Sequence, residues 1–410
     1  MGTLIRKSLL RYGNFNFDTI LSKYDTFLLT WIRDCAIMIH MEDENMYYSE
    51  ITKIIEAGLD RDKDKVVNYA LLLAKKLNQD GDEKSSKRIT SVLSRKNNGS
   101  AITDALVAPP VDQESRMGIV DIDYKPVVPQ IILSESTRAR LDDFENTIKI
   151  KDKLDDLGMP FNMSLLLYGP PGCGKTSIAN YLANKLELPL VTARLDTLIS
   201  SLLGNTAKNL RRVFDFASRQ PCVLFLDEFD AIAKARDDQH ELGELKRVVN
   251  SLLQNIDAYC QHGILVAATN HQELLDDAIW RRFQTIIEVP KPNPNEIRLL
   301  FGNITNALDM SHIIPKQFSI IIEQLNGLSY SDIQTLTQNV VKQMIIKDET
   351  IASSFDFLCE IAVFKYHGNV DRQELIRYLL KCGLAQRAIA EYFHVSQRQV
   401  RNCLNSKGDE

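Results

Sequence analysis

The sequence predicts an α/β protein built on a parallel sheet, with an all-α N-terminal domain before the sheet and a small α-helical lid and a helix-turn-helix after it. Two observations predict the sheet. Short apolar runs alternate with helical patterns in the middle of the chain, and a glycine-rich loop follows the first run. A third observation predicts the flanking domains, because apolar residues recur at helical spacing on both sides of this region. The length of 410 residues suits two or three domains.

Composition and charge are those of an ordinary globular protein. Hydrophobic residues make up 44% and charged residues 25%, which excludes collagen-like, disordered and disulfide-scaffold classes for most of the chain. The seven scattered cysteines include no CxxC pair, a pattern typical of a reducing compartment without a zinc module. Without a signal peptide or a run of about 18 apolar residues, we expect a cytoplasmic protein with no membrane partner. The net charge of −5 argues against binding nucleic acid by bulk charge, but it leaves room for a local basic module.

The chain before the sheet divides into a helical domain and a linker. Residues 1–97 carry apolar residues at helical spacing, as in the stretches 20–31 and 66–77. We expect these helices to pack on one another, and their aromatic residues also suit a partner-binding face. Residues 98–130 contain Gly, Pro and Ser without periodicity, which predicts a linker.

Five short runs rich in Val, Ile and Leu predict the strands of the sheet. They cover residues 164–168, 190–193, 222–226, 264–268 and 286–289. Uninterrupted apolar runs of this length are typical of parallel strands buried on both faces. We therefore assign residues 131–292 to a large α/β subdomain. After the punctuating stretch KPNPN, residues 293–365 predict a small helical lid, and residues 366–410 form a tail.

A phosphate-binding loop follows the first predicted strand. It fits the pattern GxxxxGK[ST] and opens a helical stretch, which is the context that this motif requires. Glycines let backbone N–H groups surround phosphates, and a helix N-terminus adds positive potential. We expect Lys175 to contact the β- and γ-phosphates and the Thr176 hydroxyl to bind Mg²⁺. The expected nucleotide-binding residues are Gly169, Pro170, Pro171, Gly172, Cys173, Gly174, Lys175, Thr176 and Ser177.

Acidic residues end the third predicted strand. Asp227 and Glu228 follow its apolar run, at the sheet edge where ligands bind in open α/β folds. We expect Asp227 to bind Mg²⁺ and Glu228 to polarise an attacking water, whereas Asp230 suits a structural role such as a helix cap. A solvated acidic strand end is the alternative for an isolated pair, but the phosphate loop favours the catalytic interpretation.

Two further motifs contain polar residues that suit phosphate chemistry. Asn270 ends the fourth predicted strand, where it can orient a water between Glu228 and the γ-phosphate or serve as a turn residue. Arg281 and Arg282 lie between aromatic residues. They suit either a salt-bridged surface pair or fingers that neutralise charge on a transferred phosphoryl group.

Together the stretches GPPGCGKT, LFLDEFDAI, AATN and DDAIWRRF resemble the AAA family of ATPases, within the AAA+ superfamily, over about residues 131–365. The resemblance implies a P-loop core with a parallel sheet and a helical lid. It also implies ATP and Mg²⁺ bound between neighbouring subunits of a homo-oligomeric ring, usually a hexamer. By this resemblance Asn270 is sensor 1, and Arg281 and Arg282 are arginine fingers that reach the next subunit's ATP.

Finer features place the chain within this family. The stretch GLSYSD at 327–332 is similar to the G-[FL]-S-x-x-D lid motif of AAA proteins proper. Those proteins lack a sensor 2 arginine, which counts against the replication-initiator and clamp-loader clades. The stretches 243–253 and 268–276 resemble bacterial stand-alone AAA ATPases with a helical N-terminal domain. Such proteins often neighbour subtilisin-like serine proteases, so the resemblance suggests a protease partner, although this sequence carries no protease signature of its own.

A segment between the phosphate loop and the acidic strand end aligns with the family's pore loop. Family members place there an aromatic-aliphatic-Gly triplet that grips a substrate polypeptide. In this sequence the triplet is Leu202, Leu203 and Gly204. Leucine offers a weaker apolar grip than an aromatic ring, and local packing of Leu202 is the alternative. Leucine at the aromatic position weakens the prediction of peptide threading more than the prediction of ATP hydrolysis.

The tail resembles a helix-turn-helix over residues 384–403. Six apolar residues fall on the buried positions of two helices, and Ser396 suits the cap of the second helix. The outer face carries Gln397, Arg398 and Arg401, which suit contacts to base edges and phosphates of DNA. His394 stands where this turn usually has Gly, so it must adopt a left-handed conformation. Residues 372–407 hold seven basic and two acidic residues, and a helical hairpin for protein contact is the alternative.

Three functions follow from these observations. The first is a ring-forming, Mg²⁺-dependent ATPase that remodels a macromolecular substrate, with protein favoured by the full hydrolytic set and the helical N-terminal domain. The second is a nucleotide-gated DNA-binding protein, favoured by Leu202 and the basic tail. The third is an ATPase that delivers substrates to a separate serine protease.

Overall fold

The computed structural model describes residues 47–59, 63–96, 110, 118–124, 126, 131–195, 198, 203–231 and 242–405. These residues fall into two compact units. The first holds the described residues up to Pro110 together with Asp215–Pro221, and the second holds the remainder. None of the helices in the described residues is long and apolar enough to span a membrane.

Before Pro110, the described residues of the first unit form α4 (Tyr48–Leu59), α5 (Lys63–Gln79) and α6 (Glu83–Lys96). They pack around a small apolar core to which α5 contributes most, with Tyr69 and Leu73 among its buried residues. The ammonium of Lys76 pairs with the carboxylate of Glu50 at 2.7 Å and links α5 to α4. The predicted helical character is thus confirmed for this part, whereas the predicted stretch 20–31 lies outside the described residues.

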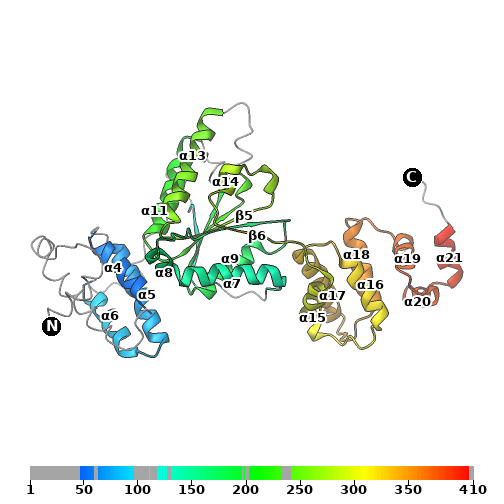
Figure 1. The fold of residues 1–410 in the computed structure, drawn as a ribbon. Helices are drawn as coiled ribbons and strands as arrows, with labels where there is room; N and C mark the ends of the chain where they lie inside the picture. The colour runs from blue at the N-terminus through cyan, green and yellow to red at the C-terminus, as the bar shows by residue number, and fades with distance from the viewer. Residues whose placement is uncertain are drawn as a thin grey trace, which may run out of the picture. The chain divides into compact units, whose positions relative to one another are not determined.

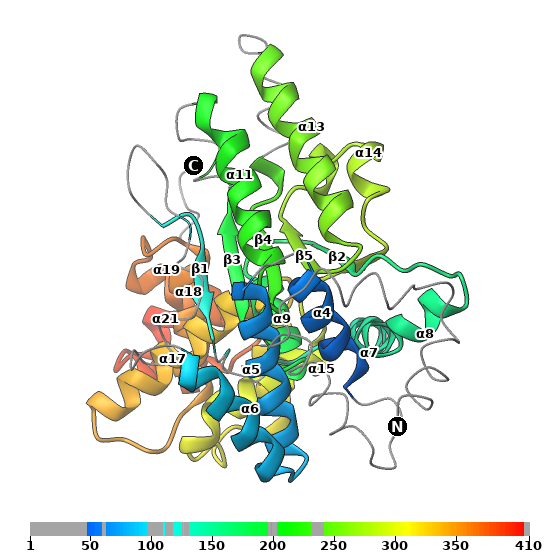
Figure 2. The ribbon, with the colours of Figure 1, turned by 90° about the vertical axis from the view of Figure 1, so that its left-hand side faces the viewer.

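The second unit is built on a six-stranded sheet of order β1-β3-β4-β5-β2-β6. Figure 2 shows β1, β3, β4, β5 and β2 side by side in this order. The strands are β1 (Asp121–Asp123), β2 (Ser164–Tyr168), β3 (Leu190–Arg194), β4 (Val223–Asp227), β5 (Ile264–Thr269) and β6 (Thr285–Glu288). The five predicted strands are parallel, as expected. β1 was not predicted; it pairs antiparallel with β3 and lies within the segment expected to be a linker.

Helices cover both faces of this sheet. α7 (Glu135–Lys149) and α9 (Lys175–Lys185) lie on one face, and α11 (Leu203–Ser218) and α13 (Leu242–Tyr259) lie on the other (Figure 1). Side chains at alternate strand positions, such as Leu165 and Leu167 of β2, pack with Ile178 of α9. Because both faces are buried, the middle positions of strands such as β2, β4 and β5 are apolar on both sides, which explains the apolar runs.

The lid consists of four helices: α15 (Pro294–Ile304), α16 (Pro315–Leu325), α17 (Tyr330–Ile346) and α18 (Ser354–Lys365). Capping boxes fix three of their starts. In α15, for example, Asn293 accepts from the backbone of Glu296 while the Glu296 carboxylate accepts from the backbone of Asn293. The same device at Ser329 and Asp332 begins α17 and accounts for the polar residues of the GLSYSD stretch.

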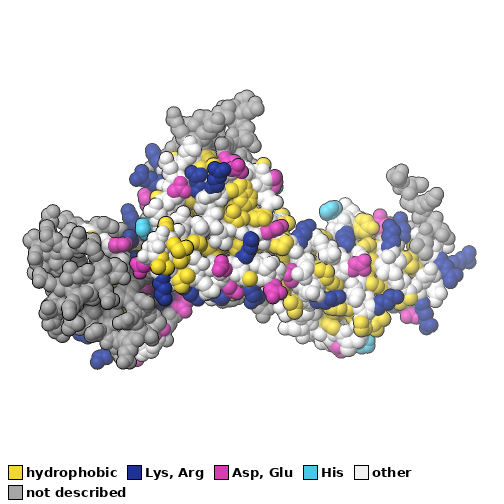
Figure 3. Space-filling model, viewed as in Figure 1, with side chains coloured by type: hydrophobic (Ala, Val, Ile, Leu, Met, Phe, Trp, Pro, Cys, Tyr) yellow, Lys and Arg dark blue, Asp and Glu magenta, His cyan; other side chains and the backbone are white. Residues whose placement is uncertain are grey.

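The tail forms three helices: α19 (Arg372–Lys381), α20 (Gln386–Tyr392) and α21 (Gln397–Asn405). His394 has φ of 51°, the left-handed conformation that the sequence requires, and the Ser396 hydroxyl accepts from the backbone N–H of Gln399 at 3.3 Å. Ile389 and Val400 are buried in the same apolar core as the lid helices. Figure 3 shows Lys and Arg side chains on the surface of this end of the chain. The helix-turn-helix assignment and the domain boundaries stay predictions.

Candidate active site

The three motifs expected to act on phosphate meet at one edge of the sheet. The phosphate loop follows β2, the acidic pair ends β4, and Asn270 follows β5. Because β5 lies between β2 and β4 in parallel register, the carboxyl ends of all three strands are adjacent. This is the edge at which open α/β sheets bind ligands.

Close contacts and positive φ angles favour glycine at two positions of the loop. A Cβ at Gly169 would lie 2.3 Å from the carbonyl oxygen of Val289, and the residue has φ of 144°. A Cβ at Gly172 would lie 2.6 Å from the hydroxyl of Ser329, and φ there is 71°. Both positions therefore exclude a side chain, and the loop stays close to the strand and lid residues beside it.

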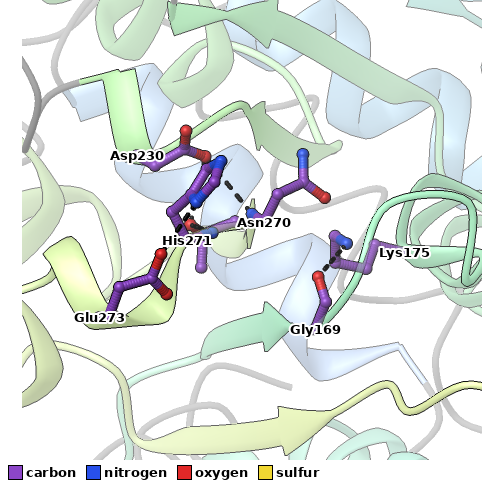
Figure 4. Close-up of polar contacts among 7 residues, drawn as sticks. Gly169, Lys175, Asp230, Asn270, His271 and Glu273 are labelled. Carbon is purple, nitrogen blue, oxygen red and sulfur yellow. Dashed lines mark hydrogen bonds and ion pairs between the residues drawn. The ribbon is translucent and has the colours of Figure 1, made fainter. Parts of the chain in front are cut away.

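Lys175 begins α9 and is 7% exposed. Its ammonium donates to the carbonyl oxygens of Gly169 at 2.7 Å and Pro170 at 2.9 Å, so it is folded back onto the loop (Figure 4). Burial lowers the pKa of Lys175, while the nearby carboxylates of Asp227 and Asp230 oppose that shift. A buried cation bonded to carbonyl dipoles at a helix N-terminus fits an anionic ligand such as a phosphate.

Oxygen ligands suited to Mg²⁺ lie beside the loop. The hydroxyl of Thr176 donates to Oδ2 of Asp227 at 3.4 Å, which brings together the two residues predicted to bind metal. The other carboxylate oxygen of Asp227 accepts from the backbone N–H of Glu228 at 2.9 Å and is held in place by it. Hydroxyl and carboxylate oxygens are the ligands that Mg²⁺ takes alongside phosphates, so these residues fit the ion.

Glu228 is held in an unusual backbone conformation. Its φ of 56° lies in the left-handed region, which residues other than Gly rarely adopt. Glu228 directly follows β4, one position after Asp227. Such strain is commonly maintained at functional sites, where the surrounding structure stabilises it.

Asp230 links the ends of β4 and β5. It is 5% exposed, and its Oδ1 accepts from the Thr269 hydroxyl at 3.2 Å and the backbone N–H of Asn270 at 3.4 Å. In Figure 4 the Asn270 side chain points away from Asp230, on the side where Lys175 lies. The sequence suggested only a structural role for Asp230. In the structure, Asp230 holds the backbone N–H of Asn270 by a hydrogen bond.

The two adjacent arginines occupy different environments. Arg281, which ends α14 (Asp277–Trp280), is exposed. Arg282 donates from its guanidinium to the carbonyl oxygen of Ala278 at 2.6 Å, and its Nε lies 3.6 Å from the Asp257 carboxylate of α13. Sequence reasoning treated the pair as equivalent, but Arg282 is bound within its own subunit.

The start of α17 contacts the phosphate loop. The backbone N–H of Ser331 donates to the carbonyl oxygen of Gly172 at 3.0 Å. The ring of Tyr330 packs against the apolar core beside the sheet, and its hydroxyl donates to Glu296 of α15 at 2.8 Å. Sequence reasoning identified this stretch as a family motif but did not predict that it touches the loop.

The comparisons with known proteins agree with this geometry. Residues 165–291 match the family described as ATPase family associated with various cellular activities (AAA), and this range contains all of the strand-end motifs. Residues 165–291 thus form a core of AAA-family sequence. The chain is also 44% identical over 210 residues to an uncharacterised AAA family ATPase, y4kL, of Sinorhizobium fredii, covering 50% of this chain and 61% of that protein.

Two further proteins are similar to parts of this chain. Proteasome-activating nucleotidase 1 of Haloferax volcanii is 33% identical over 210 residues, covering 50% of this chain and 51% of that protein. Among solved structures, the FIGL-1 AAA domain matches with a TM-score of 0.49 at 22% identity, over 64% of this chain and 90% of that domain. The chain thus spans between about half and three-fifths of the length of these curated relatives.

The pore-loop prediction stays untested for this AAA core. Leu202 lies outside the described residues, and Leu203 and Gly204 form the first positions of α11, where the placement of their side chains is not described. The proposed triplet therefore rests on the sequence alone.

We expect replacement of Asp230 by Ala to lower the rate of ATP hydrolysis by up to about 10²-fold, because small displacements of a positioned group have effects of this size. The affinity for ATP should change little, since the contacts of Lys175 and Thr176 do not involve Asp230. Steady-state kinetics that separate kcat from KM measure this difference.

Asp230→Asn is the matched control, because its side-chain carbonyl keeps the acceptor for Thr269 and Asn270. It should recover most of the lost rate. Equal losses of kcat in both variants, or a loss confined to KM, would contradict the positioning role.

Proposed function

We propose that this chain is an Mg²⁺-dependent ATPase that assembles into a homo-oligomeric ring and uses ATP hydrolysis to remodel a protein substrate. The observation that carries the proposal is the convergence of Lys175, the Thr176–Asp227 pair, Glu228 and Asn270 on one edge of the sheet. Membership of the core in the AAA family supports the same reaction.

Each residue has a chemical role at this edge. Lys175 and the loop backbone bind the phosphates, for which the ammonium must leave the carbonyl oxygens that it now contacts. Thr176 and Asp227 hold Mg²⁺, which when bound offsets the negative charge of the phosphates. Glu228 accepts the proton of the attacking water, and Asn270 orients that water. Asp230 fixes the backbone of Asn270.

The arginines favour a ring. Arg281 is exposed at the end of α14, where it is available to a neighbouring subunit. An arginine supplied to the nucleotide of another subunit stabilises the charge that develops in phosphoryl transfer. Arg282 supports this arrangement from within, because its contacts to Ala278 and Asp257 fix the short helix that leads to Arg281. A hexamer is the ring size that we propose.

The protein substrate is inferred from relatives. Proteasome-activating nucleotidases of Haloferax volcanii and Halobacterium salinarum are 30–33% identical to this chain over about half of its length, and their names connect them with the proteasome, a protease. We infer that a separate protease is a candidate partner of this chain. Leu202, in the pore loop, is the proposed contact to the substrate polypeptide.

A second candidate function is nucleotide-gated DNA binding through the tail. The observation that favours it is the exposed face of α21, which presents Arg398 and Arg401 with three amide side chains. Such residues on a helix that follows a tight turn suit a DNA groove and its phosphates.

A trap pulldown tests the two functions together. Full-length protein with Glu228→Gln is immobilised with ATP and incubated with lysate, and the captured material is scored for protein and for nucleic acid. We expect captured protein to persist when Arg398 and Arg401 are both replaced by Glu, whereas any captured DNA is lost. Loss of both classes in that variant would contradict the assignment of protein remodelling to the core. Point substitutions are preferable to removing the tail, because the tail shares its core with the lid.

A further inference from the structure

The tail and the lid form one packed body. A single apolar cluster contains Ile333 and Leu358 of the lid together with Ile376, Leu379 and Val400 of the tail. Val400, in the middle of α21, is fully buried. α21 packs on α19 and α20, and α19 in turn packs on α18 of the lid. The shared core therefore links α21 to the lid through these two helices, so a displacement of either end is resisted by the other.

Tyr392 fixes the joint between the two parts. Its ring stacks on Phe355 of α18, with ring centroids 4.7 Å apart and an interplanar angle of 16°. Its hydroxyl donates to Oδ1 of Asp356 at 3.2 Å, while the other oxygen of Asp356 accepts from Ser353 and begins α18. A second contact joins Tyr378 of α19 to Gln324 of α16 at 2.9 Å. Stacking and hydrogen bonds at both points restrict rotation of the tail against the lid.

The other end of this body touches the phosphate loop. Ser331, in the first turn of α17, donates from its backbone to Gly172, and the Ser329 side chain occupies the space that a Gly172 side chain would need. α17 contributes Ile333, Leu336 and Val340 to the shared core. If a change in the loop moves the start of α17, the packing of the core that α17 shares with α21 must change as well.

The exposed face of α21 is free to take a ligand. Arg398 and Asn402 are exposed on this helix, and Arg401 is exposed while its Nε donates to Gln386 at 3.1 Å. Amide and guanidinium side chains on one helix face form the bidentate contacts that read base edges in the major groove of duplex DNA. Val400 of the same helix is buried in the core that the tail shares with the lid.

We propose that duplex DNA on the exposed face of α21 and nucleotide at the phosphate loop are linked through the lid, so that each changes the affinity of the other. The proposal rests on the DNA-binding candidate function. Thermodynamic linkage requires the factor to be the same in both directions, and coupling between distinct sites is typically about 5- to 150-fold.

A titration of full-length protein tests the link. The probe is a fluorescein-labelled duplex of random sequence, about 30 base pairs or three helical turns long. We expect saturating duplex to change the Kd of a fluorescent ADP analogue by about fivefold or more. Saturating ADP should change the Kd of the duplex, read by anisotropy, by the same factor.

Tyr392→Ala is the variant that breaks the joint without touching either site. Tyr392 is 38% exposed, so its truncation should leave the fold intact, which a thermal melt verifies. We expect this variant to bind duplex and ADP separately as the parent does, with the coupling factor falling toward one. Tyr392→Phe keeps the stacking on Phe355 and should keep most of the coupling.

Two results would overturn the proposal, and they are distinguishable. If the duplex binds but leaves the Kd for ADP unchanged, the link through the lid and the nucleotide gating are both wrong, while DNA binding by the tail survives. If no anisotropy change occurs on adding protein, the DNA-binding function itself fails. Undiminished coupling in Tyr392→Ala would also overturn the assigned route.

Discussion

Replacement of Glu228 by Gln is expected to lower ATP turnover by about 10²–10⁴-fold, the usual contribution of a positioned general base. Gln has nearly the same shape but accepts no proton at neutral pH, so the attacking water loses its acceptor. The affinity for ATP should persist, because Lys175, Thr176 and Asp227 keep their contacts. Phosphate release measures turnover, and equilibrium binding of ATP measures affinity.

Glu273 offers a matched control for this substitution. Its carboxylate is exposed, lies three positions beyond Asn270 and pairs with the His271 ring at 2.9 Å (Figure 4). Backbone hydrogen bonding, together with His271, lowers the pKa of Glu273. Glu273→Gln should leave turnover near the parent value. Normal hydrolysis by Glu228→Gln, or an equal loss in Glu273→Gln, would contradict the assignment of Glu228 as the base.

The sheet could be predicted because the burial of its strands produces runs of apolar residues in the sequence. Strands such as β2 and β5 are buried on both faces, so most of their positions are apolar and the run is visible in sequence. β1 left no such signal, since its three residues, Asp121–Asp123, are mostly charged and exposed and depend on pairing with β3 at the sheet edge. An edge strand of this kind is fixed by its neighbour rather than by its own composition.

The site was predictable where chemistry dictates residue type at fixed spacing. Lys175, Thr176, Asp227 and Glu228 belong to motifs of that kind, and the fold brings them to one edge. The hydrogen bond between Asp230 and Asn270 joins residues 40 positions apart in the chain, so no local sequence pattern predicts it.

The contacts of the lid were hidden for a similar reason. The capping box at Ser329 is local and leaves a sequence signal, whereas the contact of Ser331 with Gly172 depends on how the lid packs. The shared core of lid and tail likewise joins Ile333 to Val400 across a stretch that looks in sequence like a boundary between domains.

Replacement of Arg281 by Ala is expected to lower turnover by about 10³–10⁵-fold, the range for an arginine that acts on the nucleotide of another subunit. Because Arg281 is exposed, the thermal stability of each subunit should not change. Arg282→Ala is the contrasting variant. It removes the hydrogen bond to Ala278 and the pairing with Asp257, so it should lower the free energy of unfolding by about 1 kcal/mol.

Mixing two inactive variants decides whether Arg281 acts on its neighbour. Lys175→Ala subunits bind no nucleotide but still present Arg281, whereas Arg281→Ala subunits keep an intact phosphate loop. In a mixed ring, an intact loop next to an intact arginine forms a complete site, so combining the two should restore part of the turnover that each lacks alone. If the mixture stays as inactive as its components while the rings assemble, Arg281 acts within its own subunit, and the proposal of a shared site fails.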